Sequence, residues 1–202
     1  MIEDYGDNPG FCFEVKIGIL RCMENLKIAF IALQERHLPS LLTWLETGHV
    51  KDWWDQDVHW TSELVKEKYG SYVHGYKIED GIQKPLQAFI ICIDDIEIGY
   101  IQLYNAHEFA REGGISLNEL PRSLAACDIF IGDPTYVGKG YGTALMKKFL
   151  QDYVDPKYEA CFVDPDTANT KAIRAYEKAG FEKIKTIQNG TVTWMIRNRP
   201  AG

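Results

Sequence analysis

The sequence predicts a single domain of the mixed α/β class, in which helices flank a β-sheet. Its 202 residues, 46% hydrophobic and 25% charged, suffice for one globular core. Apolar β-branched runs alternate with stretches in which apolar residues recur at helical spacing. No internal repeat or linker-like segment divides the chain. We therefore expect one domain over residues 26–202, preceded by an N-terminal extension, residues 1–25, whose role the sequence does not reveal.

The first expected elements are a strand over residues 27–33 and a helix over residues 35–46, with Gly48 as a helix stop. A second helix is expected over residues 61–73. The apolar face of the first helix is formed by leucines at positions i, i+3, i+4 and i+7, namely Leu38, Leu41, Leu42 and Leu45. This face is expected to pack in the core.

Between these two helices lies a segment rich in tryptophan and aspartate. Trp53 and Trp54 are adjacent, so both cannot point inward on a helix or a strand, and at least one is expected to line a cleft or an interface. Aromatic rings beside carboxylates suit an amino sugar. The alternative is that one tryptophan packs in the core and the other covers it.

Two apolar, β-branched runs, residues 86–93 and 96–104, flank Asp94 and Asp95 and predict a hairpin. Gly99 in the second run indicates a bulge or a close approach of another backbone. The long loop that follows, residues 105–122, has the length of a functional loop, and a substrate-capping role is expected for it.

A central strand is expected over residues 123–131. Its alternation places Leu124, Ala126, Asp128 and Phe130 on one face and Ala125, Cys127, Ile129 and Ile131 on the other. Asp128 is thus a carboxylate within an apolar run, which is costly unless the group has a partner or a function. Two interpretations stay open from the residues alone: a salt bridge or backbone hydrogen bond at the sheet edge, or a base that anchors and deprotonates an amine.

A glycine-rich turn, Gly138-Lys139-Gly140-Tyr141-Gly142, connects this strand to a helix expected over residues 143–153. Backbone N–H groups and the helix dipole meet at such a place, which favours an anion such as a pyrophosphate. The turn has neither the Gly-Lys-Ser/Thr ending of a nucleoside-triphosphate loop nor a Rossmann-type spacing of three glycines. On its own it is equally compatible with a simple chain reversal.

The last part of the chain predicts a buried strand over residues 160–163, which ends at Asp164, and a helix over residues 167–179, which ends at Gly180. A carboxylate at the end of a strand occupies a frequent ligand-binding position in α/β sheets. Two further strands, residues 182–187 and 192–196, flank Asn189-Gly190, which is the signal for a type I′ hairpin turn.

Charge and composition restrict the partners. The net charge of −7 argues against sequence-independent nucleic-acid binding and suits a cationic small molecule, although mild acidity also serves solubility. The five cysteines lack metal-like or scaffold-like spacing and are interpreted as reduced and mostly buried. No run has transmembrane length and the N-terminus is acidic, so a cytoplasmic protein without a membrane partner is expected. The histidines are scattered, and no metal site is expected.

Two motifs resemble the acetyl-CoA-binding segment of the GNAT acetyltransferases. In that family a Gln/Arg-x-x-Gly-x-Gly/Ala turn holds the CoA pyrophosphate, and here Gly140 and Gly142 match it, while Val137 stands where the family often has Gln or Arg. The family's later Asn-x-x-Ala-x-x-x-Tyr-x-x-x-Gly-Phe segment is matched in full by Asn169, Ala172, Tyr176, Gly180 and Phe181. The resemblance implies one domain with a central mixed, mostly antiparallel sheet flanked by helices.

Motifs spread over residues 38–195 look more narrowly like the aminoglycoside 6'-N-acetyltransferases. They are Trp44-Leu45, His49-Val50, Trp53-Trp54, Ile98-Gly99-Tyr100, Asp128 and Asp164-Pro165. This likeness implies transfer of an acetyl group from acetyl-CoA to the 6'-amine of an aminoglycoside antibiotic, and hence resistance. Other amine acceptors, such as a siderophore precursor or a protein N-terminus, remain an alternative, as does a non-catalytic acyl-CoA sensor. The oligomeric state cannot be read from the sequence.

The resemblance also assigns roles to residues. Asp128 is the expected base and amine anchor and Tyr176 the expected general acid near the leaving sulfur. Acceptor binding is expected from Asp128, Trp54, Asp164 and an acidic residue of the long loop, for which Glu112 is chosen. The expected cofactor-binding residues, besides Tyr176, are Ile129, Phe130, Ile131, Val137, Gly138, Lys139, Gly140, Tyr141, Gly142, Thr143, Asn169 and Ala172.

Overall fold

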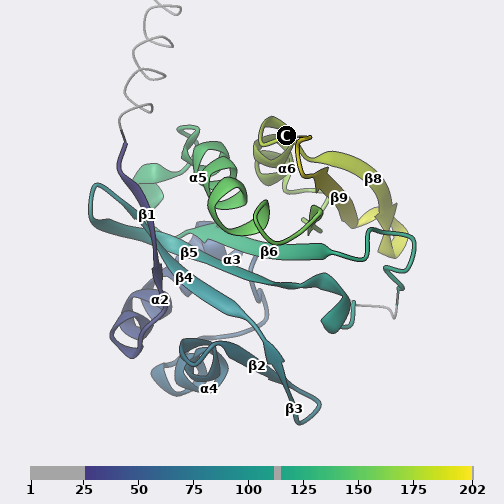
Figure 1. Cartoon of the computed structure of the whole chain (residues 1–202). Helices are drawn as coiled ribbons and strands as arrows, with labels where there is room; N and C mark the ends of the chain where they lie inside the picture. Colours follow the sequence, from purple (N-terminus) through teal and green to yellow (C-terminus); the bar gives the residue numbers. More distant parts are fainter. Residues whose placement is uncertain (1–25, 112–114, 202) are drawn as a thin grey trace, which may run out of the picture.

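The computed structural model describes residues 26–111 and 115–201 (Figure 1). In this part of the chain, seven strands form one sheet in the order β1-β4-β5-β6-β7-β9-β8. Their bounds are β1 Ile28–Ala32, β4 Gln87–Ile93, β5 Ile96–Asn105, β6 Leu124–Ile131, β7 Ala160–Val163, β8 Glu182–Ile187 and β9 Val192–Asn198. All neighbours pair antiparallel except β6 and β7, which are parallel. The predicted mixed, mostly antiparallel sheet is confirmed.

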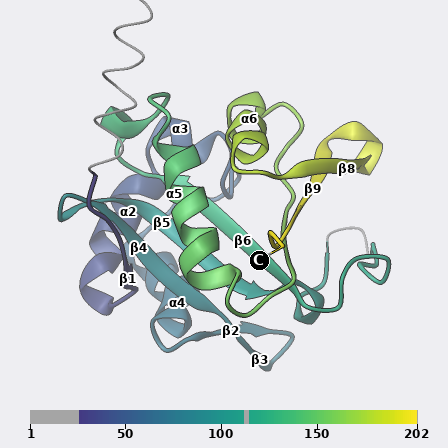
Figure 2. The ribbon, with the colours of Figure 1, turned by 45° about the horizontal axis from the view of Figure 1, so that its top comes forward.

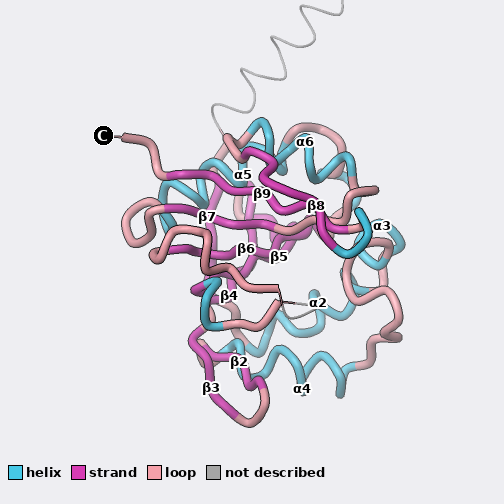
Figure 3. The backbone as a smooth tube through the Cα atoms, turned by 90° about the vertical axis from the view of Figure 1, so that its right-hand side faces the viewer, coloured by secondary structure: helices cyan, strands magenta, loops and turns pink. Residues whose placement is uncertain are grey.

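Helices cover both faces of the sheet (Figures 1 and 3). On one face lie α5 (Tyr141–Phe149) and α6 (Thr170–Lys178), and on the other lie α2 (Leu38–Leu45) and α4 (Ser62–Val73), with the short α3 (Gly48–Lys51) following α2. Figure 2 shows α5 lying across the middle strands. The chain therefore has three layers, with the sheet in the centre.

Each face of the sheet has its own hydrophobic core, and β6 contributes to both. Leu124, Ala126 and Phe130 pack with α2 and α4, whereas Ala125 and Cys127 pack with α5 and α6. The alternation predicted for this strand is confirmed, because a strand covered on both faces must send successive side chains to opposite cores.

The helix predicted for residues 35–46 is divided. A 3₁₀ turn, Glu35–His37 (η1), precedes α2, because Pro39 occupies the first turn of α2 and has no N–H to continue a preceding helix. Gly48 does not simply end this helix; it begins α3. The second predicted helix is confirmed as α4, whose N-cap Thr61 accepts a hydrogen bond from Leu64 N at 3.3 Å.

The two later helices also differ at their ends from the prediction. α5 begins at Tyr141, and its last turn continues as a π-helical segment, Leu150–Val154. α6 begins only at Thr170, because the side chain of Asn169 caps it by accepting a hydrogen bond from Ala172 N at 3.1 Å. Its expected end is confirmed, since Gly180 has a φ of +98° beyond it.

The hairpin predicted around Asp94 and Asp95 joins β4 to β5, and both aspartates have positive φ, 49° and 65°. Gly99 lies at a close approach: a Cβ there would come within 2.4 Å of Phe130 O on β6. The register of β4 with β5 also shifts next to it, between Ile91 and Cys92. The prediction for Gly99 is thus confirmed on both counts.

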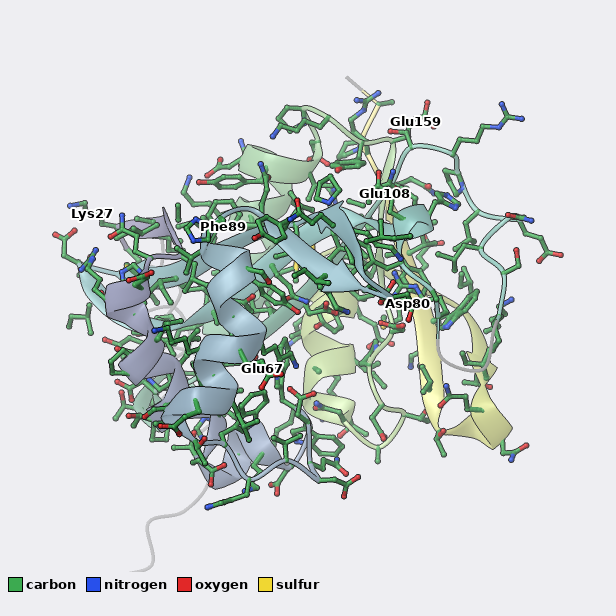
Figure 4. All side chains as sticks on the ribbon, turned by 90° about the horizontal axis from the view of Figure 1, so that it is seen from below. Lys27, Glu67, Asp80, Phe89, Glu108 and Glu159 are labelled. Atoms are coloured by element: carbon green, nitrogen blue, oxygen red, sulfur yellow. The ribbon has the colours of Figure 1, made fainter. Side chains whose placement is uncertain are left out.

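The turn predicted at Asn189-Gly190 is present between β8 and β9. Both residues have positive φ, and Thr191 N donates to Gln188 O at 3.2 Å. The sequence did not predict the second, two-stranded sheet of β2 (Tyr76–Glu79) and β3 (Ile82–Pro85), whose turn contains Asp80 (Figure 4).

The three cysteines of the described part, Cys92, Cys127 and Cys161, are free and buried. Cys12, Cys22 and the N-terminal extension predicted for residues 1–25 lie outside the described residues. Within residues 26–111 and 115–201 no helix has the length and apolar character needed to cross a membrane. The same residues contain no His, Cys, Asp or Glu cluster that could hold a metal ion.

Candidate active site

A cavity of about 720 Å³ opens where β6 and β7 separate, and it collects most of the residues that the sequence singled out. Its walls come from α3 and the segment after it, β6, the glycine turn, the segment after β7, and α6. A second cavity, of about 480 Å³, lies elsewhere and includes Phe89 and Glu108 (Figure 4). None of the predicted site residues lines it, so we place the candidate site in the first cavity.

The separation of two parallel strands creates this cavity. β6 and β7 pair only from Leu124–Ala160 to Ala126–Phe162. Beyond that point β6 continues to Ile131, and its backbone on this side has no strand partner among the described residues. Asp128 and Asp164 each lie two residues past the last pair, Ala126–Phe162. The parallel register thus brings both carboxylates to the point where the strands diverge.

Asp128 is held by a chain of two side-chain hydrogen bonds. Gln102 on β5 lies directly opposite Asp128 in the ladder, and its Nε2 donates to Asp128 Oδ2 at 2.7 Å. The amide is oriented in turn by the fully buried Tyr100, whose hydroxyl donates to Gln102 Oε1 at 2.8 Å. Asp128 has no salt bridge within the described part of the chain, so a neutral amide orients this carboxylate without cancelling its charge.

Asp164, in contrast, has a cationic partner. Arg111, from the long loop after β5, places its Nη1 at 3.3 Å from Asp164 Oδ2. Burial, followed by the charge of Asp128, raises the pKa of Asp164 to about 6, against the opposing influence of Arg111. The two carboxylates of the cavity therefore differ: one is oriented by an amide, and the other forms an ion pair.

Tyr176 reaches the cavity from α6. Its side chain is buried, packs against Phe181 with ring centroids 5.5 Å apart, and lines the cavity together with Asp128. Burial and then the negative charge of Asp128 raise the pKa of Tyr176 far above its ordinary value. Its hydroxyl consequently keeps its proton at neutral pH.

The glycine turn provides an open backbone surface at one end of the cavity. Gly138 and Gly140 have φ values of +77° and +89°, a region that other residues adopt only with strain. Gly140 is the N-cap of α5 and no side chain caps this helix, so its first-turn N–H groups remain available to an anion. A Cβ at Gly138 would meet no atom within 4 Å, which leaves room for a ligand.

Positive charge lies beside the turn, on α6. Lys171, Arg174 and Lys178 all line the cavity, and their spacing places them along one side of the helix. Asn169 and Ala172, two of the predicted cofactor residues, line it as well. This half of the cavity thus suits an anionic ligand, although the net charge of the chain is −7.

The opposite half is aromatic and acidic. Trp54 lines it, with its ring edge-to-face against Phe130 at 5.0 Å and its Nε1 donating to Tyr69 Oη at 3.2 Å. Trp53 is 44% exposed and lines the same wall with Asp52. The expectation that one adjacent tryptophan faces a cleft is confirmed, since both contribute to the cavity.

The structure brings together most, but not all, of the predicted site residues. Lys139 and Tyr141 do not line the cavity; Tyr141 packs against Tyr136 instead, with ring centroids 5.2 Å apart. Glu112 lies outside the described residues. The remaining predicted residues all line the cavity: Trp54, Asp128, Ile129, Phe130, Ile131, Val137, Gly138, Gly140, Gly142, Thr143, Asp164, Asn169, Ala172 and Tyr176.

Sequence reasoning assigned no site role to three residues of this region, although His49 belongs to one of the motifs that carry the resemblance. Gln102 and Arg111 hold the two carboxylates, and His49 places its Nε2 at 2.9 Å from Ile131 O, at the end of β6. The alternation of β5 puts Gln102 on the same face as Tyr100, but its partner depends on the register between strands. No sequence signal indicated the contact of Arg111.

The seven-stranded sheet, with a cavity where its two parallel strands diverge, defines a mixed α/β domain whose geometry suits a ligand bound between those strands. The model of the acetyltransferase (GNAT) domain family matches residues 34–189, and the chain belongs to this family. It is therefore an acetyltransferase, and the resemblance inferred from its motifs is confirmed.

Similar proteins include the aminoglycoside N(6')-acetyltransferase type 1 of Klebsiella pneumoniae, which is 28% identical over 197 residues that cover 94% of each chain. Among solved structures, AAC(6')-Ib in complex with coenzyme A and kanamycin has a TM-score of 0.70 and 26% identity, and the match covers 86% of this chain and 95% of that one. A complex of AAC(6')-Ib with paromomycin and acetyl-CoA has a TM-score of 0.71 at the same identity, covering 85% and 93%.

Proposed function

We propose that this chain transfers the acetyl group of acetyl-CoA to the 6'-amine of an aminoglycoside in the cytoplasm and thereby confers resistance. The observation that carries the proposal is the position of Asp128, between a cationic, glycine-rich half and an acidic, aromatic half of one cavity. An enzyme that joins an anionic donor to a polycationic acceptor requires this division of charge. The similar aminoglycoside acetyltransferases support the choice of acceptor.

The donor binds in the glycine-rich half. The N–H groups that open α5 receive the pyrophosphate, and Lys171, Arg174 and Lys178 supply positive charge beside it. The unpaired backbone of β6 after Asp128 offers hydrogen bonds along the thioester arm and an N–H donor for the oxyanion that develops on the acetyl carbonyl. Acetyl-CoA supplies the activated acyl group, so no acyl-enzyme is needed.

The acceptor binds in the other half. Trp54 and Trp53 present aromatic surface to the sugar, while Asp128 and the exposed Asp52 offer carboxylates to its ammonium groups. Asp128 accepts the proton of the reacting ammonium, directly or through water, because a protonated amine cannot attack. Gln102 keeps the second carboxylate oxygen fixed during this step.

Tyr176 completes the reaction. Its hydroxyl carries a proton at neutral pH, as an ordinary tyrosine does, and it donates that proton to the departing thiolate. Base and acid thus come from different elements, β6 and α6, that line the same cavity.

Identification of the product tests this proposal. Purified protein is incubated with acetyl-CoA and kanamycin, and the site of acetylation is determined by nuclear magnetic resonance. We expect acetylation at the 6' nitrogen, and we expect expression of the wild type, but not of Asp128→Asn, to raise the kanamycin concentration that a susceptible bacterium survives. Acetylation of another amine, or none, would refute the assignment of the acceptor.

A further inference from the structure

Arg111 is a buried cation behind the cavity wall, in contact with the cavity-lining Asp164. It extends from the segment after η2 (Ala106–Glu108), and its side chain is 9% exposed. Its guanidinium lies 5.1 Å from the ring centre of Phe162 and 5.7 Å from that of Tyr104. Packing between two aromatic rings fixes the position of this charge.

The stability of the fold does not explain a cation in this place. Among the described residues, Nε and Nη2 of Arg111 are buried without a hydrogen-bond partner, and Nη1 alone reaches a carboxylate, that of Asp164. Unpaired donors of a buried charge are costly, and an ion pair in such a place is often no better for stability than apolar packing. We therefore ask what the contact between Arg111 and Asp164 does for ligand binding.

This contact changes the charge that the cavity offers to an acceptor. The diverging strands bring Asp128 and Asp164 to the same level, which would give a pair of carboxylates suited to two ammonium groups. Arg111 forms its ion pair with Asp164 and is also attracted by the charge of Asp128, while the hydrogen bond that Asp128 receives within the described residues comes from the neutral amide of Gln102. Together, Asp128, Asp164 and Arg111 then carry a net charge of about −1, whereas the two carboxylates alone would carry about −2.

We propose that Arg111 is a specificity-determining residue, which occupies Asp164 and thereby favours acceptors with a hydroxyl rather than a second ammonium group on the ring that carries the reacting amine. This inference rests on the proposed function and deepens it. If an acceptor has two ammonium groups on that ring, the second must compete with Arg111 for Asp164. If it has a single ammonium group, that group pairs with Asp128 and needs no contact with Asp164.

Kanamycin A and kanamycin B test this directly, because on the ring that carries the 6'-amine they differ only in a hydroxyl and an amino group at the 2' position. Both are assayed for kcat and KM, and for Kd by calorimetry, with wild type and Arg111→Met at about pH 7.5, above the pKa of about 6 that Asp164 has beside Arg111. We expect Arg111→Met to improve kanamycin B relative to kanamycin A by about three- to tenfold in KM and Kd.

Three variants make the test specific. Arg111→Gln is measured beside Arg111→Met, so that a folding failure of one does not remove the test. Arg197→Met is the matched control, because Arg197 forms a similar, largely buried ion pair with Asp155 that does not line the cavity. In Arg111→Met combined with Asp164→Asn, the gain for kanamycin B should disappear.

Equal weakening of both kanamycins in the Arg111 variants would show that Arg111 only supports the structure, and would overturn the inference. A gain for kanamycin B that persists without the Asp164 carboxylate would overturn it too. Calorimetry separates this result from a failure of the proposed function: binding preferences that shift as expected without any turnover would support the role of Arg111 and refute the acetyltransfer to aminoglycosides.

Discussion

Replacement of Gln102 by leucine tests whether the orientation of Asp128 matters for the reaction. The change removes the donor at 2.7 Å from Asp128 Oδ2 and leaves the fully buried Tyr100 hydroxyl without its acceptor. A hydrogen bond to a charged group contributes about 1.5–3 kcal/mol, which corresponds to a fall of roughly ten- to 150-fold in kcat/KM if the bond persists in the transition state. The orphaned hydroxyl should lower the free energy of unfolding by about 1–3 kcal/mol.

The assay is release of the CoA thiol with kanamycin at saturating acetyl-CoA, together with urea unfolding of the same preparations. Tyr100→Phe is the matched control, because it removes the buried hydroxyl and leaves the bond between Gln102 and Asp128 in place. We expect its kcat to fall less than that of Gln102→Leu, because the amide still bonds Asp128 although it has lost the hydroxyl that orients it. A Gln102→Leu variant with wild-type kcat, or a Tyr100→Phe variant that loses as much, would refute the idea that the amide positions the base.

Three further predictions follow from single residues. Gly132→Ala should lower the free energy of unfolding by about 1–3 kcal/mol in urea, because its Cβ would lie 2.1 Å from the Trp44 ring; Gly48→Ala, where no atom lies within 4 Å, should cost nothing. Burial raises the pKa of Asp164 to about 6, so the native protein holds its proton more tightly than the unfolded chain does, and the stability from this group is lost as pH rises from about 4 to above 6. The loss, about 3 kcal/mol, should be absent from the pH profile of Asp164→Asn, and identical profiles would contradict it. Tyr176→Phe should lower kcat about a hundredfold with an unchanged Kd for acetyl-CoA by calorimetry, and an unaltered kcat would exclude Tyr176 as the acid.

The sequence predicted the parts of the fold that depend on local pattern. The predicted alternation in β6 was correct because the strand is buried on both faces and successive side chains pack in opposite cores. The turns at Asp94-Asp95 and Asn189-Gly190 were correct because their residues tolerate positive φ. The hairpin of β2 and β3 was missed because the strands are only four residues each and partly exposed, so their alternation is weak.

The candidate site was predictable where its residues lie in short motifs whose local structure depends on neighbouring residues in the sequence. The glycine turn and the segment from Asn169 to Tyr176 come together because β6, α5, β7 and α6 follow one another in a fixed order. Contacts between distant segments could not be predicted. The bond from Gln102 to Asp128 depends on the register of two strands, and that from Arg111 to Asp164 depends on the path of a long loop.

The measurement that most directly tests the central claim compares wild type with Asp128→Asn on kanamycin. The rate of thiol release and the Kd for acetyl-CoA are determined on the same samples. The account predicts a fall in kcat of about 10²- to 10⁴-fold with an unchanged Kd, because asparagine keeps the shape of the side chain but accepts no proton. A variant that retains most of its activity would show that Asp128 is not the base and would contradict the mechanism.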